Sequence, residues 1–259
     1  QPTPRNYVSS YFGSANTVEE ILNKTRVDVA HCHLTLSAQG PIGVFKKHKI
    51  PLVGSFYGPW YKEFRHEAER LYEESGMAYR QYLRLQIGVQ KRLQQRVLCT
   101  ANRLIVLSRY SQDQAEQLIR EVCDKCEIIP GGVEERFSSG LPESDSLPCE
   151  KGMIKVLTVR RLVRRNGVDL LIDAVKLCKD EGLDLHLFIG GRGELEAELR
   201  KQAADLNVAD RVTFLGFIED EKLPDAYRSA DLFVIPTRAE ENFGLPIVES
   251  AACGTPVIG

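Results

Sequence analysis

From residue 153 onward, short apolar runs alternate strictly with segments of helical periodicity. The runs are short and rich in β-branched residues, so we expect them to be buried strands. Strict alternation of strands and helices predicts a parallel sheet that is covered on both faces. The expected strands are residues 154–159, 185–190, 211–217, 231–236 and 256–259, and the expected helices are residues 168–182, 194–206, 219–230 and 245–254.

The first half of the chain is also mixed, although its pattern is less regular. A long helical stretch, residues 62–99, lies between the second and third expected strands. Residues 138–152 are rich in Ser, Pro and charge, which is typical of a linker between domains. We therefore predict an α/β protein with an N-terminal domain at 1–137, this linker, and a C-terminal domain at 153–259. The expected strands of the first half are residues 27–33, 50–56, 103–108 and 126–133.

The composition argues against several classes of protein. The chain is 43% apolar and 27% charged, as is typical of a soluble globular protein, and its net charge of -2 gives no sign of nucleic-acid binding. No apolar run is long enough to span a bilayer, and the N-terminal segment does not resemble a secretory signal. Seven scattered cysteines indicate reduced thiols and a cytoplasmic location. Neither the histidine spacings nor the Cys123–Cys126 pair predicts a metal site.

The later part of the long helical stretch, near residues 80–103, is strongly basic. A face of one charge sign could bind anionic lipid or a phosphorylated ligand, so a peripheral contact with the inner face of a membrane is one hypothesis. The alternative is a solvated helix face, because one-sided basic helices are common. The basic residues are Arg80, Arg84, Lys91, Arg92, Arg96 and Arg103, and residues 77–103 contain no acidic residue.

Glu241 and Glu249 stand on either side of a Gly-Leu-Pro turn. Gly244 permits the turn, and Pro246 suits the first position of the helix that follows, where no N–H is needed. The amides and the macrodipole of a helix N-terminus favour an anion, so phosphate is a plausible ligand at residues 243–245. Glu249 could accept hydrogen bonds from a ribose diol, and Glu241 could accept one from a sugar hydroxyl. The alternative is two exposed glutamates beside an ordinary helix cap.

A cluster of arginines follows the expected strand at residues 154–159. Ligands of open α/β sheets bind at the carboxyl ends of the strands, and a guanidinium can bridge two phosphate oxygens. Arg161 is therefore the first candidate for a phosphate contact, whereas Arg160, Arg164 and Arg165 are expected to be solvated.

These segments together resemble the successive blocks of the family-four retaining glycosyltransferases. The resemblance covers nearly all of residues 27–259 and implies the GT-B fold, in which two Rossmann-like domains with parallel sheets face a central cleft. The C-terminal blocks are "VRRLVRRNGVDLLIDAV", "GGRGELEAELRKQA", "RVTFLGFI", "YRSADLFVIPT" and "EENFGLPIVESAACGTPVIG". The N-terminal blocks are "DVAHCH", "GSFYGPW", "ANRLIVLSRYS" and "CEIIPGGVEERF".

The resemblance also implies roles for individual residues. Glu241 would face the donor sugar, Glu249 would hold the ribose, and Arg161 would stabilise the leaving diphosphate. No metal or other cofactor is implied, because the arginine and the helix dipole bear the charge of the leaving group. Further donor contacts are implied for Gly132, Phe217, Ile218, Phe243, Gly244 and Leu245, and acceptor-side positions for His33 and Tyr57.

Three positions depart from the family pattern. Arg160 replaces the glycine of the usual Gly-Arg-Leu, and Asn166 replaces the lysine of a later Lys-Gly. Loss of that cation could cost on the order of 3 kcal/mol of transition-state stabilisation. Tyr57 stands where members of the family often carry histidine, and tyrosine does not titrate near neutral pH. Asn166 and Tyr57 remain candidate catalytic positions, and both changes make a non-catalytic role worth testing.

The ends of the sequence also depart from the family pattern, which begins with a strand and a glycine loop and finishes with helices that cross back. We therefore expect an internal fragment of a longer protein, with both domains incomplete. These 259 residues alone are expected to transfer little or no sugar.

The leading hypothesis is transfer of a sugar from a nucleoside-diphosphate-sugar to a hydroxyl acceptor, with retention of anomeric configuration, as a step in carbohydrate biosynthesis. The acceptor could be a glycan, a lipid or a small molecule. One alternative is a non-catalytic protein that binds nucleotide-sugars or glycans. Another is a nucleotide-sugar epimerase, which would need paired acid and base carboxylates that the sequence does not identify.

Overall fold

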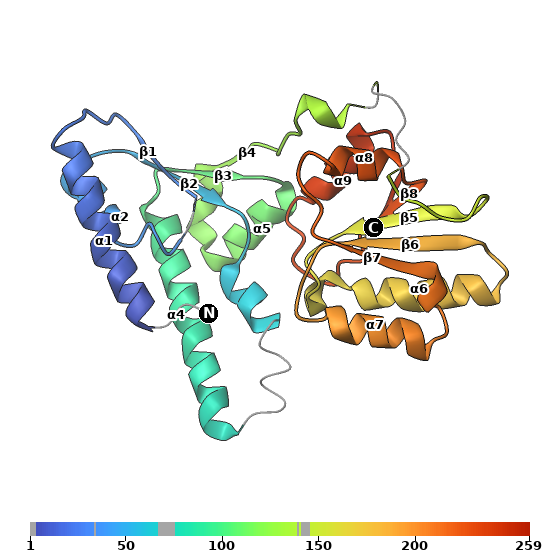
Figure 1. The fold of residues 1–259 in the computed structure, drawn as a ribbon. Coiled ribbons are helices and arrows are strands. Elements are labelled where there is room, and N and C mark those ends of the chain that lie inside the picture. Colours follow the sequence, from blue (N-terminus) through green and yellow to red (C-terminus); the bar gives the residue numbers. More distant parts are fainter. Residues whose placement is uncertain (1–3, 34, 67–75, 139, 141–145) are drawn as a thin grey trace. The chain divides into compact units, whose positions relative to one another are not determined.

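The computed structural model describes residues 4–33, 35–66, 76–138, 140 and 146–259. The chain divides into two compact units, Gln1–Pro130 and Gly131–Gly259, and each unit contains its own β-sheet (Figure 1). Both sheets are entirely parallel, which confirms the predicted α/β class.

The first unit is built on a four-stranded sheet in the order β1-β2-β3-β4. Each strand lies within one of the four predicted apolar runs, and helices connect the strands. The strands are β1 (Ala30–Cys32), β2 (Leu52–Phe56), β3 (Arg103–Val106) and β4 (Cys126–Ile128). The helices are α1 (Pro4–Leu22), α2 (Pro41–Lys47), α4 (Met77–Thr100), α5 (Arg109–Leu118) and the 3₁₀ helix η1 (Arg120–Lys125).

Helices α4 and α5 pack on this sheet through apolar side chains. Val97 and Leu98 of α4 and Ala115 of α5 share a buried cluster with Leu104 and Val106 of β3. The predicted long helical stretch divides in two, because residues 60–66 are helical and α4 begins after Gly76, whose backbone is extended. Residues 67–75 lie outside the described residues.

The second unit is built on a five-stranded sheet in the order β7-β6-β5-β8-β9. All five strands and all four helices fall within the predicted segments. The strands are β5 (Ile154–Val159), β6 (Leu185–Gly190), β7 (Val212–Gly216), β8 (Leu232–Val234) and β9 (Val257–Ile258). The helices are α6 (Val168–Asp180), α7 (Glu196–Asp205), α8 (Leu223–Arg228) and α9 (Leu245–Ala252), with 3₁₀ turns η2 (Glu135–Phe137), η3 (Arg164–Asn166) and η4 (Ala209–Arg211).

Helices cover both faces of the second sheet, α6 and α7 on one side and α8 and α9 on the other (Figure 1). Neighbouring strand residues point to opposite faces, so they belong to different cores. Val156 and Leu187 pack in the cluster beneath α6 and α7, whereas Leu157 and Phe188 pack in the cluster that contains Tyr227 of α8.

The second unit also takes in residues that we had placed outside the C-terminal domain. Phe137 is 3% exposed and Leu147 is 1% exposed, and both lie in the core beside Tyr227. The backbone N–H of Ser146 donates to Oγ of Ser229 at 2.9 Å. The end of the predicted N-terminal domain and the later part of the predicted linker therefore pack with the second unit.

None of the helices in the described part of the chain combines the length and the apolar character that are needed to cross a membrane.

Candidate functional site

The order of the second sheet reverses at β5, which pairs with β6 on one side and with β8 on the other. Such a reversal opens a crevice at the carboxyl ends of the strands, where open α/β sheets bind ligands. The loop after β5 carries Arg160, Arg161 and Asn166, and the loop after β8 carries Glu241 and leads into α9. Three of the predicted site positions, Arg161, Asn166 and Glu241, therefore lie at this edge.

Arg160 is buried at this edge rather than solvated. Its side chain is 9% exposed, and its Nη2 atom lies 2.6 Å from Oε2 of Glu241. The expectation that Arg160 is solvated is wrong because this residue directly follows the central strand. A side chain at that position lies between two loops, and the neighbouring loop supplies a carboxylate for it.

Asn166 is 3% exposed and connects this ion pair to the backbone. Its Oδ1 accepts a hydrogen bond from Nη2 of Arg160 at 3.2 Å, and its Nδ2 donates to the backbone oxygen of Arg161 at 2.7 Å. Thr237 adds a contact from the other loop, because its hydroxyl donates to Oε2 of Glu241 at 3.3 Å. Both ends of the Asn166 amide are thus engaged with protein groups.

The other arginines of the loop differ in exposure. The side chains of Arg161 and Arg164 are exposed, and Arg165 is half-buried. The expectation that Arg165 is solvated is only partly right, because its backbone oxygen accepts a hydrogen bond from the N–H of Arg238, which holds the neighbouring loop against it. Arg161 therefore presents an exposed guanidinium on a backbone that Asn166 fixes.

The turn before α9 has free amides. Gly244 adopts the left-handed conformation (φ 74°), which favours glycine, and α9 begins at Leu245. Pro246 therefore occupies the second helical position rather than the first, where its missing N–H still costs no helical hydrogen bond. The backbone N–H groups of Phe243, Gly244 and Leu245 donate to no group among the described residues. Together with the helix dipole, these donors can bind an anion.

Glu249 lies one turn into α9 and is half-buried. The hydroxyl of Tyr227, which is fully buried, donates to Oε2 of Glu249 at 2.9 Å. Burial raises the pKa of Glu249, and the hydrogen bond from Tyr227 opposes that shift only in part. Burial and the neighbouring carboxylate also raise the pKa of Tyr227, so this hydroxyl remains a donor. The second carboxylate oxygen can accept from a ligand hydroxyl.

Gly131 approaches the turn before α9 more closely than Gly132 does. The resemblance implies a donor contact for Gly132 and not for Gly131. A Cβ atom added to Gly131 would lie 2.8 Å from Cε1 of Phe243 and 3.1 Å from Cδ2 of Leu245, whereas one on Gly132 would meet nothing within 4 Å. The Gly-Gly pair in the sequence was the available signal, but it did not indicate which glycine is in contact.

We predict that Gly131→Ala destabilises the protein by about 1–3 kcal/mol relative to Gly132→Ala, because it overpacks the turn. Both variants lose the same glycine entropy in the unfolded chain, so the difference between them isolates the contact with Phe243 and Leu245. Chemical denaturation of the two variants provides the measurement. Equal stabilities of the two variants would show that the turn can move to accommodate the added methyl group with no loss of stability.

Phe217 and Ile218 follow β7 and have different environments. Phe217 is 63% exposed, whereas Ile218 packs against the core that contains Tyr227. Phe217 is thus the more exposed of the two side chains, and Ile218 is half-buried.

In the first unit, His33 and Tyr57 come together at the carboxyl ends of β1 and β2. Nδ1 of His33 and the Tyr57 hydroxyl are 2.7 Å apart, and the His31 ring lies 4.1 Å from the His33 ring. Burial and the neighbouring His33 lower the pKa of His31. The two acceptor-side candidates also line a pocket of about 300 Å³ with Thr35, Leu36, Ser55, Gly58, Trp60, Glu63 and Gln94.

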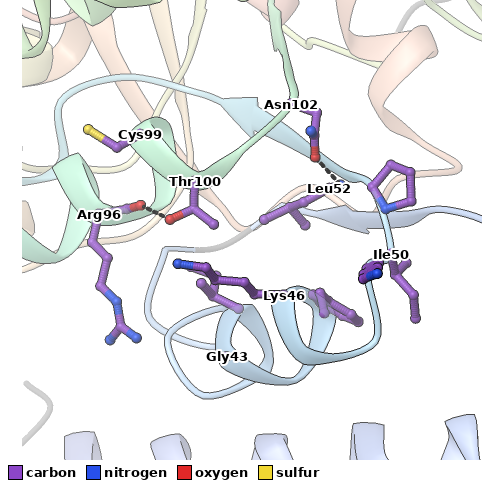
Figure 2. A pocket seen from close by; sticks show the side chains of 12 residues that line it. Gly43, Lys46, Ile50, Leu52, Arg96, Cys99, Thr100 and Asn102 are labelled. Carbon is purple, nitrogen blue, oxygen red and sulfur yellow. Dashed lines mark hydrogen bonds between the residues drawn. The ribbon is translucent and has the colours of Figure 1, made fainter.

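A larger pocket of the first unit, about 590 Å³, lies at the amino end of β2 (Figure 2). The side chain of Asn102 accepts from the N–H of Leu52 at 2.8 Å, and the Thr100 hydroxyl donates to the backbone oxygen of Arg96 at 2.8 Å. None of the predicted donor-site or acceptor-side residues lines this pocket, although Arg96 of the basic stretch does. Because ligands of parallel sheets bind at the carboxyl ends of the strands, we assign it no role in the reaction.

No group of three or more His, Cys, Asp or Glu side chains in the described ranges could hold a metal ion. The cysteines whose side chains the structure describes are free thiols at positions 32, 99, 126, 149, 178 and 253.

Two family models match the chain. Residues 2–137 match the model described as Glycosyltransferase Family 4, and residues 143–259 match the model described as glycosyl transferases group 1.

Curated relatives match parts of the chain. Mannosylfructose-phosphate synthase of Agrobacterium fabrum is 40% identical in an alignment of 148 residues that covers 51% of this chain and 31% of that protein. D-inositol 3-phosphate glycosyltransferase 1 of Catenulispora acidiphila is 34% identical in an alignment of 176 residues that covers 62% of this chain and 41% of that protein. The matches thus span less than half the length of these two relatives.

Solved structures match almost the whole chain. Sucrose-phosphate synthase from Thermosynechococcus elongatus has a TM-score of 0.75 and 22% identity, covering 99% of this chain and 63% of that one. Anabaena HepE, in complex with UDP and glucose, has a TM-score of 0.71 and 21% identity, covering 95% of this chain and 61% of that one. Identities this low establish the fold alone, and with the two parallel sheets they confirm the GT-B fold class.

Proposed function

The chain belongs to glycosyltransferase family 4, and on this premise we propose that the protein transfers a sugar from a nucleoside-diphosphate-sugar to a hydroxyl acceptor with retention of anomeric configuration. The observation that carries the proposal is the α9 turn. Among the described residues, the backbone N–H groups of Phe243, Gly244 and Leu245 donate to no acceptor, and in the sequence they stand between Glu241 and Glu249, next to the switch point of the sheet. A nucleotide-sugar has a diphosphate for the amides, a ribose for Glu249 and sugar hydroxyls for Glu241.

The chain's own groups suffice to bear the charge of the leaving diphosphate. Arg161 presents an exposed guanidinium and α9 presents its free amides, both at the carboxyl edge of the sheet. Donors fixed in this way stabilise charge that develops as the sugar leaves through an oxocarbenium-like state. We propose that the donor phosphate itself takes the proton of the acceptor and that no divalent metal is required. Loss of transfer activity when divalent metal ions are chelated would contradict the proposal that no metal is required.

Relatives support the donor class. The structures of Anabaena HepE are complexes with UDP, with UDP and glucose, and with UDP-glucose. The named activities of the curated relatives include mannosyl and inositol phosphate glycosyl transfer.

For the acceptor, we propose the pocket around His33 and Tyr57. It offers a hydroxyl, an imidazole and the Glu63 carboxylate beside the indole of Trp60. Such a combination of polar groups with an aromatic face suits a polyhydroxylated acceptor.

We propose further that the protein is cytoplasmic and contacts anionic membrane through α4. Tyr82, Leu85 and Val89 are exposed apolar side chains at helical spacing, and Arg92 beside them is exposed as well. Basic and apolar side chains on one helix favour the membrane interface. Cosedimentation with anionic vesicles that is unchanged by Leu85→Gln and Arg92→Gln together would argue against this contact.

Non-catalytic binding of a nucleotide-sugar is the second candidate. It is favoured by Asn166, which stands where the family has a lysine and whose amide is fully engaged. A thermal-shift panel of UDP, GDP, ADP and their sugars on the complete protein, followed by transfer assays, tests both candidates. We expect one nucleotide to raise the melting temperature and its sugar to be transferred. Binding without transfer by wild type, with transfer by Asn166→Lys, would establish the binder instead. No shift with any nucleotide would refute both.

A further inference from the structure

The ion pair between Arg160 and Glu241 is the feature that the proposed function does not yet use; its guanidinium is largely buried, and its carboxylate is 31% exposed. It joins the loop after β5 to the loop after β8, directly across the switch point of the sheet. Burial of a guanidinium is costly unless its charge is paired and its N–H groups are bonded. A solvated arginine at this position would avoid that cost. The burial of Arg160 therefore suggests that its charge has a role in the candidate site.

The contacts of Arg160 define how it is held. A single nitrogen, Nη2, bonds both Oδ1 of Asn166 at 3.2 Å and Oε2 of Glu241 at 2.6 Å. Asn166 is anchored in turn to the backbone oxygen of Arg161 at 2.7 Å. The guanidinium is therefore fixed from behind by an amide and faces the carboxylate that meets the donor sugar in the proposed function.

Positions 160 and 166 compete for one place. A lysine at position 166 would be two bonds longer than asparagine, and its ammonium would come to where Nη2 of Arg160 now lies. An arginine at position 160 and a lysine at position 166 would repel each other beside Glu241. With neither cation, the Glu241 carboxylate would lose its ion-pair partner. In the described part of the chain, the cation that pairs with Glu241 comes from position 160.

We propose that Arg160 is a positioning residue of the donor site, which supplies from the end of β5 the positive charge that position 166 lacks and holds Glu241 toward the donor sugar. This inference rests on the proposed function. It goes beyond that proposal because it names Arg160 as the source of the positive charge and Glu241 as the residue through which Arg160 acts.

The test is a set of exchange variants of the complete protein, assayed with the donor that the nucleotide panel identifies. We expect Arg160→Gly to lower kcat about 100-fold, the size of one lost fixed donor, with a smaller change in the donor KM. Asn166→Lys alone should lower kcat at least about 10-fold, because two cations then compete. The double variant, with one cation again, should recover to within about 5-fold of wild type.

A purely structural role would give a different result. Loss of an ion pair that only stabilises the loops would lower the melting temperature, and a lysine at position 166 would not restore kcat. Arg211→Gly is the matched control, because Arg211 is 19% exposed and pairs with Asp184 at 3.2 Å at the opposite edge of the same sheet. It should lower stability and leave kcat unchanged.

A second cycle tests the connection to Glu241. In a Glu241→Gln background, Arg160→Gly should cost less than about 3-fold in kcat, because the carboxylate that it positions is gone. If Arg160→Gly does not fold, Arg160→Met is used in its place in every variant of the test, because methionine keeps the apolar stem of the arginine side chain.

The inference is overturned if the Arg160 variant transfers sugar as fast as wild type, or if the double variant folds but is no more active than Arg160→Gly. These outcomes leave the proposed function intact. If wild type neither binds a nucleotide-sugar nor transfers from it, the proposed function fails and the inference fails with it.

Discussion

Arg161→Ala should lower kcat by about 10²–10³-fold, with little change in the stability of the protein. The side chain is exposed and follows the central strand β5, where a diphosphate bound at the α9 turn would lie. The backbone that carries this side chain is held in place before the reaction, because the backbone oxygen of Arg161 accepts hydrogen bonds from Asn166 and from the N–H of Val163. Steady-state kinetics on the complete protein measure the loss.

Arg164→Ala is the matched control for this experiment. Arg164 is also exposed and belongs to the same loop, but it lies in the 3₁₀ turn η3 rather than directly after the strand. We expect a change in kcat of less than about 3-fold for this variant, since general loss of one surface charge is worth little. Equal losses in the two variants would mean that the loop attracts the donor by its overall charge, and Arg161 would have no special role.

Glu249→Gln should stabilise the protein at neutral pH and weaken donor binding. The amide still accepts the hydrogen bond from Tyr227, but it no longer buries a charge. A ribose diol would lose a charged hydrogen-bond acceptor. A hydrogen bond to a charged group is worth about 1.5–3 kcal/mol, so its loss should raise the donor dissociation constant about 10–100-fold. Calorimetric titration with the nucleotide measures the second effect.

The stabilising effect should depend on pH with a defined sign. The pKa of Glu249 is raised in the folded state, chiefly by burial, from an ordinary value of 4.5. The folded protein therefore holds this proton more tightly than the unfolded chain does. Its contribution to stability is complete below pH 4.5 and is lost as the pH rises through the folded-state pKa. The advantage of Glu249→Gln should accordingly be absent in acid and grow toward neutral pH.

The control for Glu249 is Glu221→Gln. Glu221 is exposed near the start of α8, so its replacement should change stability by less than about 0.5 kcal/mol at any pH. A Glu249→Gln variant that is less stable than wild type at neutral pH would contradict our account of the buried carboxylate.

The sequence predicts much of the second unit because its signals are local. Strands β5 to β9 are apolar runs, and the α9 turn depends on Gly244 and the amides beside it. The burial of Arg160 could not be predicted in this way. It depends on Glu241, which is distant in sequence and is brought close only by the pairing of β5 with β8. The roles of Arg161, Glu241 and Glu249 remain predictions that the variants above will test.

Domain limits were harder to predict for a related reason. Residues 138–152 have the composition of a linker, yet Leu147 is buried and Ser146 bonds Ser229. Composition describes the average of a segment, whereas packing depends on single side chains. Gly131 shows the same limit, because only the position of Phe243 reveals that this glycine, and not its neighbour, is in contact.

Tyr227 belongs both to the core and to the proposed donor site. Its ring lies 5.1 Å from that of Phe233 and 6.2 Å from that of Phe137, while its hydroxyl holds Glu249. A substitution at either phenylalanine would move that hydroxyl without touching the ligand. Over evolutionary time, drift in the aromatic interior would therefore appear as altered nucleotide affinity, which gives lineages a route to adjust that affinity while every ligand-contacting residue stays unchanged.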